Sequence, residues 1–350
     1  MQTLTVHASR TYEVLVGRGL LSCAGALCRE VNGGARALLV SDSNVGPLYT
    51  MNVAGSLRDA GYTVKTYMFP AGEASKTLDT VAGLYAQLAA GGFTRRDLLV
   101  ALGGGVTGDM TGFTAATWLR GVDFVQIPTS LLAQVDSSVG GKTGVDLPQG
   151  KNLVGAFHQP VRVIADTNTL RTLPEAVWAD GMGEVIKTAA IRDAALFAAL
   201  EQQPPTPETA EDTVARCVAI KRDVVERDEQ ESGERKLLNF GHTLGHALEQ
   251  HDGYCTLTHG AAVGLGMVRI TRASERQGLT VPGTADRLAR LLAACGLPAE
   301  SDVPLPALLP ALKLDKKSAG NGIDLVLLRD IGDSFVQHLE REALPQFLGE

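Results

Sequence analysis

Short apolar runs alternate with helical segments along the first hundred residues. The apolar run at 37–42 predicts a buried strand, and those at 62–69 and 97–102 predict two further strands. The periodicity of 77–90 predicts a helix between the second and third. Continuous apolar strands separated by helices are typical of a parallel sheet that is covered on both faces. The N-terminal half of the chain is therefore predicted to be an α/β domain.

Beyond about residue 170 the pattern changes to longer segments rich in alanine and leucine. The proline-bearing stretches at 204–205 and 304–310 are expected to connect helices. The change of pattern predicts two domains, an α/β domain over 1–170 and an all-helical domain over 171–350. The helices predicted in the second domain lie at 175–200, 206–230, 235–251, 259–277 and 284–295.

Composition and charge narrow the class of protein. The chain has 350 residues, of which 45% are hydrophobic and 20% charged, as expected for a soluble globular protein. A net charge of −7 offers no broad basic surface, which argues against nucleic acid and anionic membranes as partners. The five cysteines are scattered, the N-terminus lacks a signal-peptide pattern, and no apolar run approaches the roughly 18 residues of a membrane helix. We therefore expect a soluble cytoplasmic protein.

The third predicted strand runs into a glycine loop, 103–108, with the spacing GxGxxG. Such a loop lets the backbone approach a pyrophosphate at the start of the next helix. The same spacing also occurs in glycine turns that only serve packing. A carboxylate that ends a strand usually contacts the ribose, and Asp42, with Asn44 beside it, has that position, whereas Asp123 begins its strand. The order is unusual, because the acidic strand precedes the glycine loop.

A second segment, 126–144, is rich in hydroxyl side chains and glycine and contains Lys142; Lys151 and Asn152 follow it. Hydroxyls, glycine amides and an ammonium group together are the chemistry of an anion-binding cradle. Either piece alone could be a surface loop with a solvated lysine. Two such pieces beside a glycine loop favour a bound anion.

Four of the seven histidines, at 242, 246, 251 and 259, lie within eighteen residues, and three of them are candidates for a metal or acid/base site. His242 and His246 are four residues apart and share one face of a predicted helix, and His259 follows them. With a carboxylate such as Glu184 they could hold a divalent metal, since two histidines and one carboxylate form a catalytic zinc set with an open position. Thr243 follows His242, so the HExxH motif is absent. The alternative is a set of ordinary core or surface histidines, and spacing leaves open whether His246 is a ligand or an acid/base.

Lysine and arginine residues gather in the motif-bearing segments of this acidic chain. Lys187 lies three residues after Glu184 in an apolar context, where at least one of the two must face a polar interior. The alternative is a surface ion pair of little energetic value. A cationic pocket in an acidic protein implies a small polyanionic ligand. The cationic residues of these segments are Lys142, Lys151, Lys187, Lys221, Arg235, Lys316 and Lys317.

Together these motifs resemble those of the 3-dehydroquinate synthase family, the sugar-phosphate cyclases of the shikimate pathway. The resemblance covers about residues 40–330 in family order. It implies an N-terminal Rossmann-like NAD-binding domain, a helical C-terminal domain that binds metal and substrate, and an active site in the cleft between them. The matching segments are 72–76, 103–109, 120–121, 128–142, 150–153, 184–187, 238–246, 259–260 and 315–317.

The resemblance also implies roles for individual residues. Glu184, His242 and His259 would hold one divalent metal, Zn²⁺ in the first place with Co²⁺ as an alternative, and His246 would be an acid/base or phosphate-contacting residue. Arg120 resembles a residue that reaches the phosphate bound by a neighbouring subunit, which implies a homodimer. The implied substrate contacts are Lys142, Lys151, Asn152, Lys187, Lys221, Arg235, Asn239 and one of Lys316 or Lys317. The implied NAD contacts are Asp42, Asn44, Gly72, Glu73, Lys76, Thr77, Gly104, Gly105, Val106, Gly108, Asp109, Thr129, Ser130, Asp136, Lys142, Lys151, Thr169 and Thr172.

The implied activity is conversion of 3-deoxy-D-arabino-heptulosonate 7-phosphate to 3-dehydroquinate and phosphate. NAD would take a hydride from the substrate, phosphate would be eliminated, the hydride would return, and an intramolecular aldol reaction would close the ring. Retention of Lys221, Asn239 and His246 favours this substrate over those of sister cyclases. Departures from the family pattern are small and include Thr107, where an aliphatic residue is common, and Ser130, where threonine is. The rival interpretations are a related sugar-phosphate cyclase, a zinc- and NAD-dependent polyol dehydrogenase and a catalytically silent NAD-binding protein.

Overall fold

The computed structural model describes residues 1–253, 255–314 and 322–349, and the chain divides into two compact units. The first unit comprises Met1–Leu173 and Pro207–Glu229, and the second comprises Pro174–Thr206 and Gln230–Glu350. The first change of unit lies close to the predicted domain boundary at 170/171. The segment Pro207–Glu229 differs, because the sequence placed it in the second domain.

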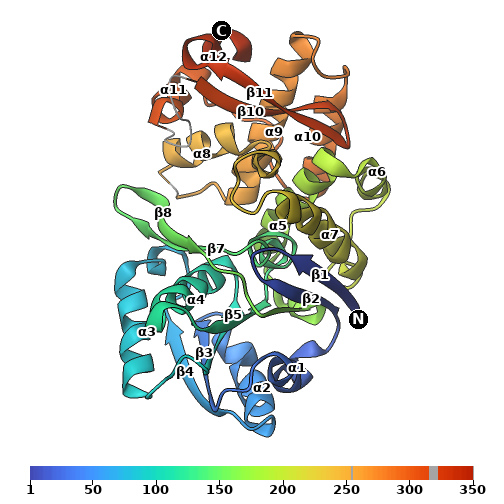
Figure 1. Cartoon of the computed structure of the whole chain (residues 1–350). Coiled ribbons are helices and arrows are strands. Elements are labelled where there is room, and N and C mark those ends of the chain that lie inside the picture. The colour runs from blue at the N-terminus through green and yellow to red at the C-terminus, as the bar shows by residue number, and fades with distance from the viewer. Residues whose placement is uncertain (254, 315–321, 350) are drawn as a thin grey trace. The chain divides into compact units, whose positions relative to one another are not determined.

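The first unit is built on a seven-stranded sheet (Figure 1), in which the strand order is β1-β2-β9-β6-β5-β3-β4. Neighbouring strands are parallel except for β1 and β2, which form an antiparallel pair at one edge. The predicted strands are confirmed as β3, β4 and β5, but β4 is a largely exposed strand at the edge of the sheet, whereas β3 and β5 are buried. The strands are β1 (Gln2–His7), β2 (Thr11–Gly17), β3 (Arg36–Asp42), β4 (Thr63–Phe69), β5 (Leu98–Gly103), β6 (Asp123–Pro128) and β9 (Arg162–Asp166).

Helices cover both faces of this sheet, as predicted. Side chains alternate along each strand, so Leu39 and Val100 join one buried cluster while Leu38 and Leu99 join the other. The first cluster packs against α1 (Ala24–Val31) and α2 (Gly46–Asp59), and the second against α3 (Leu78–Ala90) and α4 (Gly105–Thr117). The β7–β8 hairpin, Lys142–Leu147 with Gly150–Phe157, adds Val145 to the second cluster. The continuous apolar runs of β3 and β5 are therefore explained by burial on both sides.

The path of the chain reverses at β3. From β3 the chain passes to the edge strand β4 and then crosses back to β5, which lies on the other side of β3. Ser41 pairs with Leu102, so Asp42 at the end of β3 lies level with Gly103 at the end of β5. Open α/β sheets bind ligands beyond the carboxyl ends of the strands at such a reversal. The unusual order of acidic strand and glycine loop along the chain therefore does not separate them in space.

Helix α7 (Glu211–Arg227) belongs to the first unit although it follows two elements of the second. Its apolar face is buried, and its end meets the first β-hairpin, where the Glu226 carboxylate accepts from His7 N at 2.7 Å. Glu229 just beyond accepts from Ser9 N at 2.7 Å and from Gln159 Nε2 at 2.7 Å. The helix was predicted, but its partner surface could not be, since an apolar helix face does not say which sheet it covers.

The second unit is predominantly helical, as predicted, but it is not all-helical. An antiparallel hairpin of β10 (Gly322–Asp330) and β11 (Asp333–Glu340) completes it. Strand β10 is largely buried, and the turn between the two strands contains Gly332, whose φ of +88° favours glycine. The helices are α5 (Glu175–Arg192), α6 (Ala194–Gln202), α8 (His242–His251), α9 (His259–Arg276), α10 (Thr284–Ala294), α11 (Leu305–Leu314) and α12 (Leu344–Leu348).

Three predicted segments differ in detail from the observed helices. The predicted helix 175–200 is split at Asp193, whose carboxylate accepts from Leu196 N at 2.8 Å and so starts a second helix. The predicted helix 235–251 begins as a 3₁₀ turn, Glu234–Asn239, before α8. The expectation that 304–310 only connects helices is wrong, because these residues belong largely to α11, with Pro310 inside it. Among the described residues, no helix is long and apolar enough to cross a membrane.

Candidate active site

Glycines bring α5 and α9 of the second unit into backbone contact. A Cβ on Gly183 would lie 2.7 Å from the Cα of Gly260, and a Cβ on Gly260 would overlap the carbonyl oxygen of Asp180. The Asp180 carboxylate also accepts from Gly260 N at 2.5 Å, which caps the start of α9 from a neighbouring helix. Only glycine permits this approach. It places Glu184, beside Gly183, next to the first turn of α9.

A similar contact joins α8 and α9. A Cβ on Gly266 would overlap the carbonyl oxygen of Gly241, and a Cβ on Gly245 would lie 3.1 Å from the backbone of Ala262. Gly241 itself has φ +79° and precedes α8 directly. We call Gly183, Gly241, Gly245, Gly260 and Gly266 the glycine seam. Because Gly183, Gly241 and Gly260 are next to the predicted metal ligands in the sequence, close backbone packing fixes the positions of those ligands.

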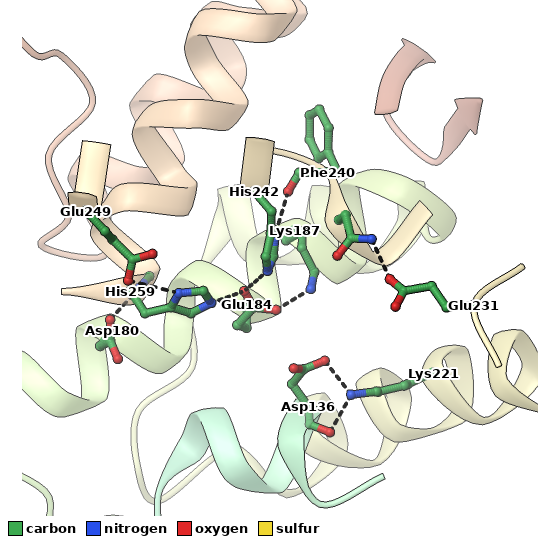
Figure 2. Close-up of polar contacts among 12 residues, drawn as sticks. Asp136, Asp180, Glu184, Lys187, Lys221, Glu231, Phe240, His242, Glu249 and His259 are labelled. Atoms are coloured by element: carbon green, nitrogen blue, oxygen red, sulfur yellow. Dashed lines mark hydrogen bonds and ion pairs between the residues drawn. The ribbon is translucent and has the colours of Figure 1, made fainter. Parts of the chain in front are cut away.

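The predicted metal ligands converge across this seam (Figure 2). The Oε1 atom of Glu184 lies 3.7 Å from His242 Nε2 and 3.6 Å from His259 Nε2. The ligand atoms of the three residues all lie within 4.8 Å of one another. Two imidazoles and one carboxylate form the donor set of catalytic zinc sites, with a fourth position open to water or substrate. The residues therefore fit a divalent metal.

The carboxylate of Glu184 is built to carry a negative charge in the interior. Its side chain is 1% exposed, and among the described residues neither oxygen has a hydrogen-bond partner of good geometry, although the Lys187 ammonium forms an ion pair with Oε2. Burial alone would raise the pKa of Glu184, but Lys187 and the neighbouring His259 outweigh it and hold that pKa at about 2. A buried carboxylate whose Oε1 has only two imidazoles nearby, within the part of the chain that the structure describes, is satisfied by a bound cation.

Both histidine ligands are oriented through their other ring nitrogen. His242 Nδ1 lies 3.2 Å from the carbonyl oxygen of Phe240, and His259 Nδ1 lies 3.4 Å from Glu249 Oε1. Such outer contacts fix the tautomer and leave Nε2 for a metal. Burial and nearby cations lower the pKa of His242 well below its usual value. Burial also opposes the charge on His259, but Glu184 and Glu249 raise its pKa to about 10.

His246 lies beside this centre without a settled role. Its ring centroid is 5.3 Å from that of His242 and 6.1 Å from that of His259, and the residue is exposed. It could also share a cation with Glu249 and His259, whose ligand atoms lie within the same range. The choice between ligand and acid/base therefore stays open. Glu249 was not anticipated, because a glutamate seven residues after His242 looks like an ordinary helical surface residue.

Asn239 and Arg235 lie on the 3₁₀ turn that leads into α8. Asn239 Nδ2 donates to Glu231 Oε1 at 2.6 Å, and Arg235 is 1% exposed. Glu231 has φ +61°, a left-handed conformation that strains a residue with a side chain. Strain of this kind persists where the position matters for function, so Glu231 joins the candidate site. The sequence analysis missed it because it lies in a polar loop without a motif.

In the first unit, Asp42 is held rigidly at the carboxyl edge of the sheet. Its Oδ1 accepts from Asn44 N at 2.8 Å and from Val45 N at 3.0 Å, while Oδ2 accepts from Thr107 Oγ1 at 3.3 Å. Thr107, where an aliphatic residue is common in the family, therefore donates a hydrogen bond to the carboxylate that is expected to bind the ribose. Asp123 is the first residue of β6, so it lies at the amino ends of the parallel strands, away from Asp42, and it forms an ion pair with Arg10.

The glycine loop joins the end of β5 to the start of α4, as a dinucleotide site requires. Gly104 is the N-cap of α4 and Gly105 its first residue. Thr129 N donates to Gly103 O at 3.0 Å, and a Cβ on Gly104 would lie 3.5 Å from Ser130 Oγ. A helix N-terminus that begins with two glycines leaves its backbone N–H groups accessible to a pyrophosphate. These residues fit NAD.

Lys76 links the turn before α3 to α4 and to the β7–β8 hairpin. Its Nζ lies 2.6 Å from Asp109 Oδ2 and 2.6 Å from Asn152 Oδ1. Burial favours the neutral amine, but Asp109 and Glu73 raise the pKa of Lys76, which stays charged. Asp146 was missed by the sequence analysis; its Oδ1 accepts from the backbone N of Asn152 at 2.7 Å and fixes that residue at φ +54°.

Four further predicted residues, two of which pair with each other, have partners within the first unit. Lys221 Nζ on α7 donates to Asp136 Oδ1 at 2.7 Å (Figure 2). Thr169 Oγ1 accepts from Gln134 Nε2 at 3.1 Å, and Thr172 Oγ1 lies 2.6 Å from the hydroxyl of Tyr49. Neither Gln134 nor Tyr49 was anticipated, since nothing in their local sequence marks them.

The other predicted residues lie on the elements already described for the site, except for Arg120, Lys316 and Lys317. Arg120 follows α4, a helix of 13 residues and so about 20 Å long, which keeps it away from the glycine loop at the other end. Lys316 and Lys317 lie outside the described residues. Gly72 and Thr77 flank the turn of Lys76, Val106 and Gly108 lie in the first turn of α4, and Lys142 and Lys151 lie on the β7–β8 hairpin.

Comparison with known proteins agrees with this geometry. Two family models match, described as 3-dehydroquinate synthase N-terminal over residues 66–180 and 3-dehydroquinate synthase C-terminal over residues 181–318. A 3-dehydroquinate synthase from Clostridium acetobutylicum is 44% identical over 99% of each chain. A structure of 2-deoxy-scyllo-inosose synthase with carbaglucose-6-phosphate, NAD⁺ and Co²⁺ is 26% identical over 99% of each chain, with a TM-score of 0.87.

A second solved structure leads to the same family of folds. ValA, a 2-epi-5-epi-valiolone synthase from Streptomyces hygroscopicus subsp. jinggangensis 5008 with NAD⁺ and Zn²⁺ bound, is 27% identical, covers 99% of this chain and 98% of its own, and has a TM-score of 0.87. The resemblance stated from the motifs is confirmed by the family models and by the full-length relative. The chain belongs to the 3-dehydroquinate synthase family.

Proposed function

We propose that the chain is a 3-dehydroquinate synthase, a carbon–oxygen lyase that converts 3-deoxy-D-arabino-heptulosonate 7-phosphate to 3-dehydroquinate and phosphate. The observation that carries the proposal is the convergence of Glu184, His242 and His259 on one point, in a chain that also has a glycine loop level with Asp42. Related cyclase structures hold NAD⁺ together with Co²⁺ or Zn²⁺. A divalent metal and NAD are accordingly the proposed cofactors.

The chain's own residues have separable duties in this reaction. When bound, the metal polarises an oxygen at the reacting carbon, and NAD takes up and returns a hydride. The proposed metal ligands are His242, His259 and Glu184, and the ammonium group of Lys187 keeps the Glu184 carboxylate ionised. Asp42 and the start of α4 are proposed to hold NAD, and Arg235, Asn239 and Lys221 the anionic groups of the substrate.

This function is tested by following phosphate and NADH together. With substrate, catalytic NAD and Zn²⁺, we expect many phosphates released per NAD and no accumulation of absorbance at 340 nm. Dialysis against a chelator is expected to abolish turnover, and Zn²⁺ or Co²⁺ to restore it. Steady NADH formation would instead favour a polyol dehydrogenase, and turnover only of another sugar phosphate would favour a sister cyclase.

We further propose that the enzyme is a homodimer in which Arg120 serves the site of the partner subunit. Leu119 and Arg120 are both exposed and left-handed, with φ 49° and 68°, and Arg95 Nε donates to Leu119 O at 2.9 Å to hold the turn. Two consecutive strained residues cost about 1–3 kcal/mol each, which points to a function for the outward side chain. A cytoplasmic location is also proposed, since five scattered free thiols suit a reducing compartment.

The role of Arg120 in the partner site is tested by complementation. Arg120→Ala is expected to lose about 100-fold in turnover, and His242→Ala to be inactive. Co-expressed in equal amounts, the two variants should recover about a quarter of wild-type activity, since half of the dimers are mixed and each mixed dimer has one complete site. If Arg120 acted within its own subunit, the mixture would show no recovery.

A further inference from the structure

Two serine hydroxyls flank the glycine loop, and only one of them was expected there. A Cβ on Gly104 would lie 3.5 Å from Ser130 Oγ, and a Cβ on Gly105 would lie 3.1 Å from Ser137 Oγ. Gly105 is the first residue of α4, so the hydroxyl of Ser137 lies against the positive end of that helix. Ser137 ends the π-helical turn Ala133–Ser137, which also carries Asp136.

The two hydroxyls differ in how they are satisfied. Ser130 Oγ accepts from Ala133 N at 3.3 Å. Ser137 Oγ is buried, and it has no hydrogen-bond partner among the residues that the structure describes. A buried hydroxyl without a partner destabilises the fold by about 1–3 kcal/mol, so such atoms are rare. An atom of this kind beside a predicted cofactor site is explained when the cofactor supplies the missing partner.

We propose that Ser137 is a binding residue for the dinucleotide, and that its hydroxyl donates to a pyrophosphate oxygen. The inference rests on the proposed function, because it presumes that NAD binds at the glycine loop. The geometry favours the pyrophosphate over other parts of NAD, since backbone amides at the start of α4 attract an anion and Ser137 faces the first residue of that helix. A hydroxyl that donates to an anionic oxygen forms a strong hydrogen bond.

The chain offers a matched control in the next residue. Ser138 Oγ is also buried and without a partner in the described part of the chain. It is not among the atoms that a Cβ on Gly104 or Gly105 would meet. Alanine at either position removes a hydroxyl that has no partner among the described residues, and because alanine is smaller than serine neither substitution introduces a clash. Any difference between Ser137→Ala and Ser138→Ala in cofactor binding therefore reports contact with the cofactor.

The test measures Kd for NAD and for ADP-ribose by titration calorimetry, together with Tm without ligand. Ser137→Ala is expected to bind both ligands roughly tenfold more weakly, which is the value of one hydrogen bond to a charged group. Its Tm without ligand should be equal to or above that of the wild type, because a buried unsatisfied group is lost. Ser138→Ala should show the same Tm behaviour and unchanged Kd values.

The other outcomes contradict either the proposed function or the inference about Ser137. If the wild type binds no NAD, the proposed function fails. If the wild type binds NAD and Ser137→Ala binds it equally well, the inference about Ser137 is wrong while the function stands. Weaker binding of NAD with unchanged binding of ADP-ribose would overturn the assignment to the pyrophosphate. A fall in Tm together with the loss of affinity would assign Ser137 to the fold instead.

Discussion

His242→Ala is expected to leave the protein folded but to remove its bound metal, and with it at least about a thousandfold in turnover, the equivalent of several kcal/mol of transition-state stabilisation. The imidazole of His242 is one of three ligands, and its Nε2 lies 3.7 Å from the Glu184 carboxylate. Without it, two ligands remain, fewer than catalytic zinc sites use. Metal content by mass spectrometry and steady-state phosphate release measure the two effects.

A matched control lies at the other end of the same helix. His251 is the last residue of α8 and is exposed. His251→Ala removes the same side chain from the same helix and should keep both metal and turnover within about twofold of wild type, since exposed substitutions have small effects. Full metal occupancy in His242→Ala would show that the centre lies elsewhere, with the second group around His246 as the first candidate.

Gly260→Ala is expected to destabilise the protein and to lose the metal although no ligand is changed. The added Cβ would overlap the carbonyl oxygen of Asp180, which is backbone and cannot swing aside. Forced apart, α5 and α9 would carry Glu184 and His259 away from each other. Overpacking against backbone costs about 3 kcal/mol or more, and Tm should fall by roughly 6–12 °C. Thermal unfolding and metal content measure the result.

The same substitution one turn further along α9 is the control. A Cβ on Gly264 would lie 2.9 Å from Cδ2 of Leu292, the flexible end of a side chain. Gly264→Ala also gains helix propensity, so its net effect should stay within about 1 kcal/mol, and the metal should be retained. If both variants kept wild-type Tm and metal content, the glycine seam would not determine the geometry of the centre.

The fold could be predicted where one local pattern has one physical meaning. Apolar runs such as 37–42 are buried on both faces, which is why β3 and β5 were predicted close to their observed bounds. The edge strand β4 was also predicted, although most of its residues are exposed. The helix α7 was also predicted, but its unit was not, because an apolar face carries no information about its partner. The β10–β11 hairpin was missed because its apolar strand lies in a half dominated by helices.

The residues of the candidate site likewise include some that the sequence predicts and some that only the fold reveals. Glu184, His242 and His259 could be found because few side chains bind metals, and their spacing suits helices. Glu249, Glu231 and Asp146 could not, because a glutamate or aspartate in a polar stretch usually faces solvent and only the fold shows what it touches. Ser137 is one of several serines in its segment, and what distinguishes it is that its buried hydroxyl lies close to Gly105 and has no partner among the described residues.

The interleaving of the two units has a practical consequence for anyone who dissects the protein. The chain passes from one unit to the other at residues 173/174, 206/207 and 229/230. A recombinant fragment that stops at 173 would lack α7 and expose the apolar surface that Val214, Val218 and Val225 bury. Such truncations favour aggregation over independent folding. Chimaeras with relatives should therefore exchange 207–229 together with the first 173 residues.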